Sequence, residues 1–290
     1  MRLKSGSAYN WFLFILLCLI WGSSFILMKK GLNNLNAFQV ASLRIISAGM
    51  ILLPVGWNKF RTIARKDLFL VFVSGLLGTF IPAYLFCLAE TKIDSGLASV
   101  LNALTPLFTL IIGAFFFQSK LALHKWIGVL IGMVGLILLL TAGKELRFNH
   151  IGFAGLITIA TICYGINVNL VSRYLKHISS TLLAAGAFAM LILPAIMILL
   201  WTGYTYTPLT IGFAYSTGAA LVLGIFGTAI ASILFYELMK KAGPLFASMV
   251  TYGIPFVGIF WGIADGESLG LVQVSCLFLI LSGVYLANKK

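Results

Sequence analysis

The sequence contains few charged residues. Only 9% of its 290 residues are Asp, Glu, Lys or Arg, and only 7 are acidic, whereas an average soluble domain is about 25% charged. Hydrophobic residues make up 61% of the chain. This balance excludes water as the main solvent of the chain and predicts a membrane protein, with the lipid bilayer as its surroundings.

Histidine and cysteine are also scarce, with 3 and 4 residues respectively. The histidines gather no carboxylates or thiols at the spacing of a metal site, and no CxxC pair occurs. Each cysteine falls alone in a different apolar run: Cys18, Cys87, Cys163 and Cys276. We therefore expect no metal, no other cofactor and no catalytic residues.

A nucleotide-binding loop is missing as well. No GxxxxGK[ST] pattern occurs, and the longest connection, 143–151, is too short to form a domain. Any function must therefore be built from the apolar segments themselves. Transport by such a chain would be driven by gradients of solutes or ions across the membrane, without ATP hydrolysis.

What the sequence does contain is a series of ten apolar runs. Each is long enough to cross a hydrocarbon core of about 30 Å, which takes about 20 helical residues. They cover approximately residues 10–28, 37–57, 68–89, 95–117, 124–142, 152–171, 180–202, 213–236, 244–264 and 269–287. We therefore predict an all-α membrane protein with ten transmembrane helices.

Basic residues are distributed unevenly between the ends of these runs. Most Lys and Arg fall on the side of the N-terminus, as in 59–66. By the positive-inside rule this predicts that both termini are cytoplasmic, in the inner (plasma) membrane. The same bias accounts for the net charge of +13, so we expect no nucleic acid as a partner.

The segment 73–113 is repeated without a gap at 222–262. Identical positions include Gly75/Gly224, Gly78/Gly227, Thr79/Thr228, Ser99/Ser248 and Pro106/Pro255. In this register the third and fourth runs align with the eighth and ninth, so the repeated unit is five helices long. Two such units predict two domains, 1–143 and 144–290. Because five is odd, the second copy is inverted in the membrane, as in many secondary transporters.

Several motifs resemble those of the drug/metabolite transporter superfamily, in particular proteins with two EamA-type repeats. The chain has LIWGSSF at Leu19 to Phe25, SGLASVLNALTPLFTLIIGAFFF, then KWIGVLIGMVGLILLL at Lys125 to Leu140, and in the second copy GPLFASMVTYGIPFVGIFWG and LILSGVYL. The resemblance covers nearly the whole chain. It implies ten helices, a central cavity, and export or exchange of small metabolites such as amino acids. Family repeats commonly carry an acidic residue after the fourth and ninth helices; Glu267 fits this pattern, whereas the first copy has Gln118.

Polar side chains near the middle of a span are costly in a bilayer, which makes them candidates for function. Four lie shortly before the matched prolines: Asn102, Thr105, Thr251 and Tyr252. Pro106 and Pro255 lack a backbone N–H, which predicts a paired hinge beside a midplane binding surface. The alternative is that the polar side chains only repair kinks or bridge helices.

Other runs supply further substrate-binding candidates: Trp21, Ser24, Tyr84, Tyr164 and Asn167. Trp21-Gly22 and Tyr164-Gly165 occupy similar places in the first and sixth runs. Aromatic rings at a cavity can stack on apolar parts of a solute, while amide and hydroxyl groups hold its polar ends. Packing, or a place in an interfacial aromatic belt, is the alternative for each aromatic ring.

Arg44 lies within the second run and is a possible charge partner of a substrate carboxylate, which a guanidinium can bind through two bonds. The alternative is that its long side chain reaches the membrane surface. The carboxylates map near the ends of runs, at Glu90, Asp94, Glu237, Asp265 and Glu267. No buried proton-relay pair is visible, so facilitated diffusion, exchange and proton coupling all remain open.

Together these features predict a secondary transporter, an exporter or exchanger that moves a small metabolite by alternating access around a midplane cavity. The alternatives are another solute class, such as drug-like or sugar-type compounds, and an intramembrane enzyme. An enzyme would need a nucleophile with a base, or a metal cluster, within the spans. A structural scaffold would leave the matched prolines unexplained. The expected assembly is a monomer or a homodimer.

Overall fold

The computed structural model describes residues 5–60, 62–117, 123–142, 148–267 and 270–288, and every regular element in these ranges is a helix. In chain order the α-helices of the first half are α1 (Ser5–Leu32), α2 (Ala37–Phe60), α3 (Arg65–Gly75), α4 (Ile81–Ala89), α5 (Ser95–Asn102), α6 (Thr105–Phe117) and α7 (Leu123–Ala142). Those of the second half are α8 (Phe148–Tyr174), α9 (Ser180–Trp201), α10 (Ile211–Gly224), α11 (Ala231–Ala242), α12 (Pro244–Ser248), α13 (Val250–Ala264) and α14 (Leu271–Asn288). A short 3₁₀-helix, η2 (Tyr204–Tyr206), follows α9.

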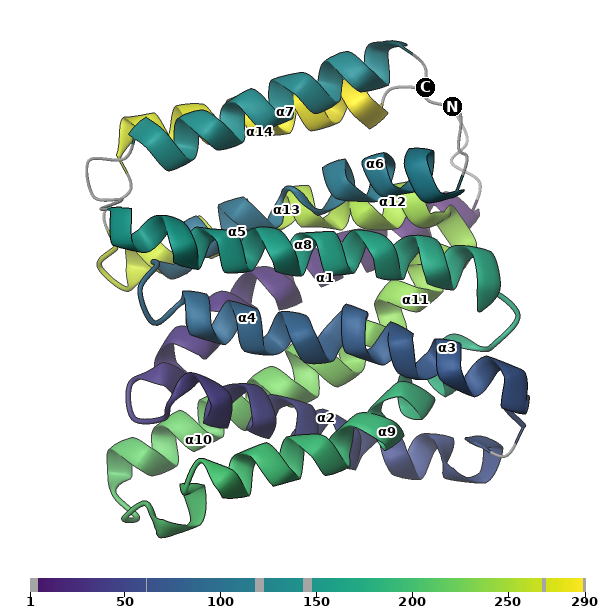
Figure 1. Cartoon of the computed structure of the whole chain (residues 1–290), viewed down its shortest axis with the longest axis vertical. Coiled ribbons are helices and arrows are strands. Elements are labelled where there is room, and N and C mark those ends of the chain that lie inside the picture. The colour runs from purple at the N-terminus through teal and green to yellow at the C-terminus, as the bar shows by residue number, and fades with distance from the viewer. Residues whose placement is uncertain (1–4, 61, 118–122, 143–147, 268–269, 289–290) are drawn as a thin grey trace.

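Eight continuous helical stretches of the described residues are long and apolar enough to cross a membrane. They include stretches in which two or three short elements follow one another, such as Arg65–Ala89 and Ile211–Ala242. The helices α7 and α14 run beside them (Figure 1). The chain is therefore an all-helical, multi-pass membrane protein of about ten helices.

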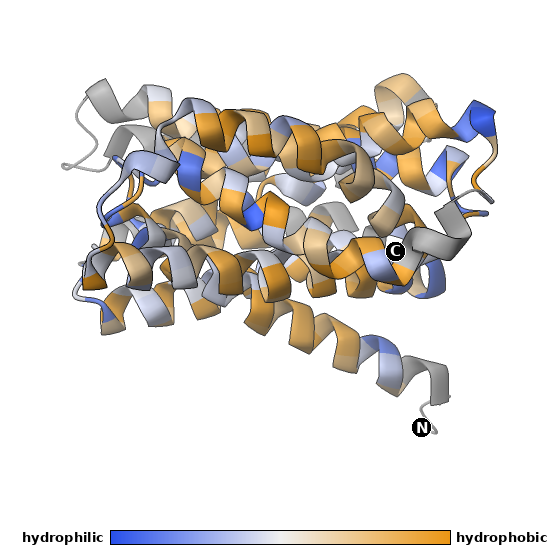
Figure 2. Cartoon of the chain, turned by 90° about the horizontal axis from the view of Figure 1, so that it is seen from below, coloured by the Kyte–Doolittle hydropathy of each residue, from blue (hydrophilic) through white to orange (hydrophobic). Residues whose placement is uncertain are grey.

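The outside of the bundle is apolar, as lipid contact requires. Met50, Leu193 and Met197 lie within long helices, yet they are 65%, 64% and 63% exposed. Figure 2 shows that hydrophobic residues cover most of the helical ribbon, while many of the hydrophilic residues lie toward the two ends of the bundle. The long apolar runs thus form helices that face the bilayer on one side and each other on the opposite side.

The helices run roughly parallel or antiparallel across the bundle, and α7 and α14 form a pair at one edge (Figure 1). The two approach each other closely at glycines, because a Cβ added at Gly283 would meet the backbone of Gly128 and Gly132. Small residues of this kind permit close helix packing in membranes. Neither helix of this pair contributes any of its described residues to the central cavity reported below.

The repeated segments share distortions of the helical backbone that the sequence pattern did not predict. A π-helix, η1 (Leu76–Phe80), joins α3 to α4, and a second, η3 (Ile225–Ile230), joins α10 to α11. Both contain the matched Gly-Thr pair of the repeat. Such wide turns are frequent at functional sites.

The stretches with the matched prolines are distorted too. The first is broken between Asn102 and Thr105, just before Pro106. In the second, α12 ends at Ser248 and Pro255 lies inside α13. Backbone bonds of the tighter 3₁₀ type occur at equivalent places, from Ala103 N to Val100 O (3.0 Å) and from Tyr252 N to Met249 O (3.0 Å). Gln118 and the predicted domain boundary at 143 and 144 lie outside the described residues.

Candidate functional site: a cavity between the repeated segments

A cavity with about 100 Å³ of free space lies where α1, α2, α8 and the distorted stretches meet. That volume has room for several water molecules or part of a small solute. Its wall includes both Gly-Thr pairs of the π-helices: Gly78, Thr79, Gly227 and Thr228. The matched halves of the repeat thus contribute to one common cavity.

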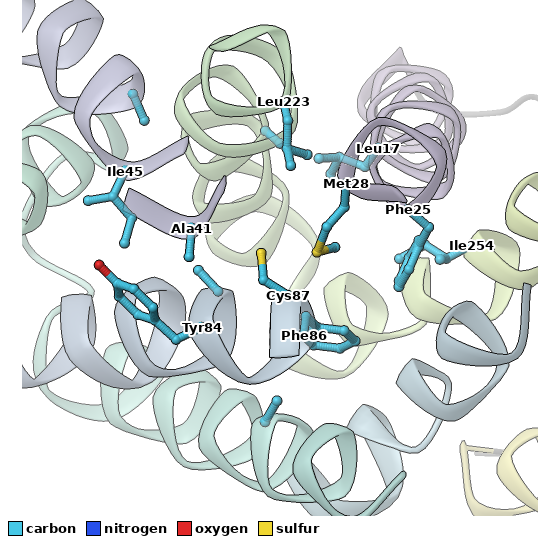
Figure 3. Close-up of a cluster of buried hydrophobic side chains, with 14 of the residues drawn as sticks. Leu17, Phe25, Met28, Ala41, Ile45, Tyr84, Phe86, Cys87, Leu223 and Ile254 are labelled. Carbon is cyan, nitrogen blue, oxygen red and sulfur yellow. The ribbon is translucent and has the colours of Figure 1, made fainter. Parts of the chain in front are cut away.

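Six of the eight predicted substrate-binding residues line this cavity: Trp21, Ser24, Asn102, Tyr164, Asn167 and Thr251. Thr105 and Arg44 line it as well. The other wall positions are mainly aromatic or small. Figure 3 shows Phe25 and Met28 of α1 and Phe86 of α4 directed toward the same region.

Tyr84 and Tyr252 are placed away from the cavity wall. The Tyr84 hydroxyl forms a hydrogen bond with Ser42 Oγ (2.8 Å), and its ring packs beneath α2, next to Phe80 (Figure 3). Tyr252 is half-buried and packs against the hydrophobic core. Both matched prolines also lie outside the wall, so the proposed hinges flank the cavity without lining it.

Residues of α1 and α8 approach the opposite copy's π-helix in matching ways. The side chain of Ser24 on α1 lies where a Cβ of Gly227 would stand, and that of Asn167 on α8 lies where a Cβ of Gly78 would stand. Glycine is therefore needed at both positions for this close approach. Trp21 Nε1 donates to the Gly227 carbonyl (2.9 Å) and Ser74 Oγ donates to Asn167 Oδ1 (2.7 Å).

Arg44 on α2 is the cationic residue in the cavity wall. Arg44 is 9% exposed, and its Nε donates a hydrogen bond to Thr228 Oγ1 at 2.6 Å. Within the described ranges no carboxylate lies within 4.0 Å of its guanidinium. Its side chain thus lies in the wall of the cavity, and the structure does not show it reaching a surface of the bundle. A guanidinium here can receive a carboxylate.

At one end of the bundle, two lysines and two carboxylates form an ion-pair cluster of Lys29, Lys30, Asp265 and Glu267. Lys29 Nζ lies 2.9 Å from Asp265 Oδ2 and 2.7 Å from Glu267 Oε1, and Lys30 pairs with Asp265. The Glu267 carboxylate also accepts from Ser95 Oγ (2.7 Å) and from the backbone N–H of Gly96 (2.9 Å). The cluster thus ties the end of α1, the start of α5 and the segment after α13 together.

These contacts hold both carboxylates in their ionised form. Burial alone would raise the pKa of Glu267, but its bonds from Lys29, Ser95 and Gly96 outweigh that effect and lower the pKa. The bonds from Lys30 and Lys29 likewise lower the pKa of Asp265. The family pattern of an acidic residue after helix nine was the only sequence signal for this cluster, and it did not reveal the partners on α1 and α5.

Close to the cluster, Glu90 follows the last residue of α4. The residue is 8% exposed, and neither of its carboxylate oxygens has a hydrogen-bond partner in the described part of the chain. Its position near the end of an apolar run suggested a place beside water. The structure instead buries it, directly after α4 ends at Ala89.

The opposite end of the bundle carries more exposed ion pairs. Glu237 accepts from Tyr9 Oη (3.0 Å) and pairs with Lys241 (2.9 Å), and Asp67 pairs with His177 (2.8 Å). The side chains of Lys241 and His177 are 51% and 59% exposed. Because exposed pairs contribute little to stability, we expect these two pairs to stabilise the fold less than the ion-pair cluster does.

An apolar helical bundle with a polar cavity between two repeated segments defines a membrane transporter. The model of the EamA-like transporter family matches residues 10–141 and 153–289, and the chain belongs to this family. This family consists of transporters, not enzymes, which excludes the intramembrane enzyme.

Relatives support this assignment along nearly the whole chain. An "Uncharacterized transporter" of Archaeoglobus fulgidus is 27% identical over 97% of this chain and 99% of its own length. The "Uncharacterized inner membrane transporter YedA" of Escherichia coli is 28% identical over 94% of this chain and 88% of its own. A "Probable amino-acid metabolite efflux pump" of Salmonella typhimurium is 26% identical over 95% and 93%.

A solved structure has the same fold. The structural match covers 97% of this chain and 96% of the solved chain, with a TM-score of 0.66 and 16% sequence identity. At this identity the likeness concerns the fold alone.

Proposed function

We propose that this EamA-family protein is a secondary transporter of the inner membrane that exports or exchanges small metabolites such as amino acids. It works by alternating access around the central cavity. The observation that carries the proposal is the composition of the cavity wall. Arg44 is buried there with no described carboxylate within 4.0 Å of its guanidinium, and aromatic rings line the same space.

The chemistry of the wall favours a solute with one carboxylate and an apolar part. Arg44 supplies a cation for the carboxylate, Asn102 and Asn167 supply amide groups, and Trp21 and Phe235 supply aromatic surface. An amino acid combines these features. The name of the Salmonella relative, an amino-acid metabolite efflux pump, agrees with this class of solute.

The proposed mechanism uses two inverted five-helix domains, 1–143 and 144–290, with both termini cytoplasmic. The matched π-helices and the matching contacts of α1 and α8 support this division, because each copy's first helix packs on the other copy's distorted stretch. In transporters with inverted repeats, rocking of one half against the other exposes a midplane site to each side in turn. The ion-pair cluster would then lie on the outer side.

Flux through liposomes tests this proposal. Purified protein is reconstituted without ATP, and the liposomes are loaded with a labelled amino acid from a panel covering aromatic, aliphatic, acidic and basic types. We expect faster loss of a neutral amino acid with an apolar side chain than from protein-free liposomes. Transport of labelled sugars or cationic drugs, with no transport of amino acids, would replace the proposed solute class by one of these alternatives.

A further inference from the structure

Glu90 is the residue whose environment the transport function leaves unexplained. Among the described residues, only its side chain has oxygen or nitrogen atoms that are fully shielded from solvent and lack a hydrogen-bond partner. An ionised carboxylate in such a place is strongly disfavoured, because neither water nor a donor replaces its hydration. A protonated carboxyl group is neutral and is far better tolerated there.

Four ionisable groups of the described residues interact electrostatically with Glu90. Arg44 on α2 and Lys29 on α1 favour its ionised form, Glu267 after α13 disfavours it, and the neutral thiol of Cys87 lies on the same helix. None of the cations lies within 4.0 Å of the Glu90 carboxylate in the described structure. Burial, followed by the charge of Glu267, raises the pKa of Glu90 well above its ordinary value.

The lysine that acts on Glu90 is engaged elsewhere. Lys29 contacts both Asp265 and Glu267, and it holds α1 to the segment after α13 while doing so. If the elements of the ion-pair cluster separate, Lys29 loses these two carboxylates and water reaches the end of α4. Both changes favour an ionised Glu90, the first by freeing a cation and the second by restoring hydration.

We propose that Glu90 is a proton-binding site that couples proton movement to the opening of the ion-pair cluster. Glu90 holds a proton on its carboxyl group while the cluster is closed. When the cluster opens, the O–H bond breaks, the proton passes to water, and the carboxylate that remains is balanced by Lys29. Linkage then requires that protonation of Glu90 favours the closed cluster by as much as closing favours protonation.

This inference rests on the proposed transport function, because the opening of the cluster is one step of alternating access. While the cluster is closed, Glu90 regains its proton from the opposite side of the membrane, so one proton crosses in each cycle and a pH gradient can drive the solute against its own gradient. Exchange of solute for solute needs no net proton movement, so it does not require Glu90 to titrate. The two modes of transport therefore separate the role of Glu90 from the ability to transport.

The first experiment needs no solute. Infrared difference spectra of the protein in lipid, taken over a pH titration, detect the carbonyl band of a protonated carboxyl group. We expect a band that is present at neutral pH in the wild-type protein and absent in Glu90→Gln. Glu267→Gln leaves Glu90 in place, removes a charge that disfavours its ionisation and leaves Lys29 with Asp265 as its one remaining carboxylate partner among the described residues, so the band should titrate at lower pH.

The matched control is Glu237→Gln, which removes an exposed, ion-paired carboxylate at the opposite end of the bundle. This variant should leave the band unchanged. A wild-type protein without the band at neutral pH, or a band that Glu90→Gln leaves intact, would overturn the proposal. So would an unchanged titration in Glu267→Gln.

The second experiment compares two modes of transport in liposomes, using the amino acid of the panel that is transported best. Glu90→Gln resembles the protonated residue, and we expect it to retain amino-acid exchange at equal pH, at a reduced rate because the closed cluster is favoured. Its accumulation driven by a pH gradient should fall to the level seen without a gradient. Undiminished accumulation in this variant, or wild-type accumulation that is indifferent to pH, would contradict the coupling. Absence of both modes in the wild-type protein would instead refute the transport function, and the infrared titration would still report on Glu90.

Discussion

In the proposed transporter, Arg44 selects a solute that carries a carboxylate. A buried guanidinium is costly in a bilayer, and by default it indicates a functional site. Its Nε is held by Thr228 of the π-helix η3, so the side chain is fixed before any solute arrives. A fixed cation loses less conformational freedom on binding than a mobile one does.

Replacing Arg44 should therefore weaken binding of a carboxylate solute. A hydrogen bond to a charged group contributes about 1.5–3 kcal/mol, so Arg44→Gln should raise the concentration for half-maximal flux by roughly 10- to 100-fold. Arg44→Lys keeps the charge but loses the planar fork, and it should recover part of the affinity. Concentration-dependent flux of the transported amino acid into liposomes measures both.

The control for this prediction is Arg173→Gln. Arg173 is an exposed basic residue in the last turn of α8, outside the cavity wall. It should leave half-maximal flux unchanged. Equal effects of the two substitutions would show that Arg44 contributes only to the general charge of the protein.

Glu267 has a different role, because it stabilises the closed end of the bundle. Its side chain is 2% exposed and binds Lys29 together with the first turn of α5. Loss of such a cap and partner typically costs about 1–3 kcal/mol. We expect Glu267→Gln to lower the midpoint of thermal unfolding in detergent, and Glu237→Gln, which removes an exposed pair, to change it little.

Acid should have the same effect as this substitution. The folded protein lowers the pKa values of Asp265 and Glu267, so their contribution to stability is complete above the ordinary values of about 3.9 and 4.3. It is lost as the pH falls through the lowered values, because protonation removes the partners of Lys29 and Lys30. The wild-type unfolding midpoint should fall across this acidic range, and the fall should be smaller in Glu267→Gln. An equal fall in both would assign the acid sensitivity to other groups.

At the scale of elements, the two π-helices shape the cavity. An extra residue in a helical turn opens the backbone ladder, and a glycine there lets another helix come close. The same pair of features occurs in η1 and η3, with Asn167 against the first and Ser24 against the second. The central wall of the cavity is therefore built twice from one pattern.

Adding a methyl group at these contacts should disturb the wall. Gly227→Ala places a Cβ into the side chain of Ser24, and overpacking of this kind costs about 1–3 kcal/mol. Gly218→Ala in α10 is the matched control, since no atom lies within 4 Å of its added Cβ, and it should be neutral or slightly stabilising. Thermal unfolding in detergent compares the two, and an equal effect would mean that helix propensity alone decides the outcome.

At the scale of the whole molecule, the halves are interleaved. The helix α1 packs on α10 and α13, while α8 packs on α4 and α6, so each first helix lies against the other half. A motion of one half against the other therefore changes the contacts of both α1 and α8. The ion-pair cluster joins α1 to the segment after α13, which places a firm connection at one end of this interface.

The orientation of the bundle remains a prediction from charge. The starts of α1 and α3 and the ends of α2 and α14 lie at the same edge in Figure 1. If the positive-inside rule holds, reporter fusions should place residues 59–66 in the cytoplasm and residues 143–151 outside. A cytoplasmic location for 143–151 would reverse the topology and move the ion-pair cluster to the inner side.

The sequence by itself determined which stretches cross the membrane and where the chain repeats, because both depend on local composition and on the register of the chain with itself. It also pointed to most of the polar residues of the cavity, since a bilayer disfavours polar groups anywhere else in a span. It left the π-helices, the Arg44–Thr228 contact and the burial of Glu90 undecided. Those depend on contacts between residues far apart in the chain, such as Arg44 and Thr228, which are 184 positions apart, and only the tertiary structure brings such residues together.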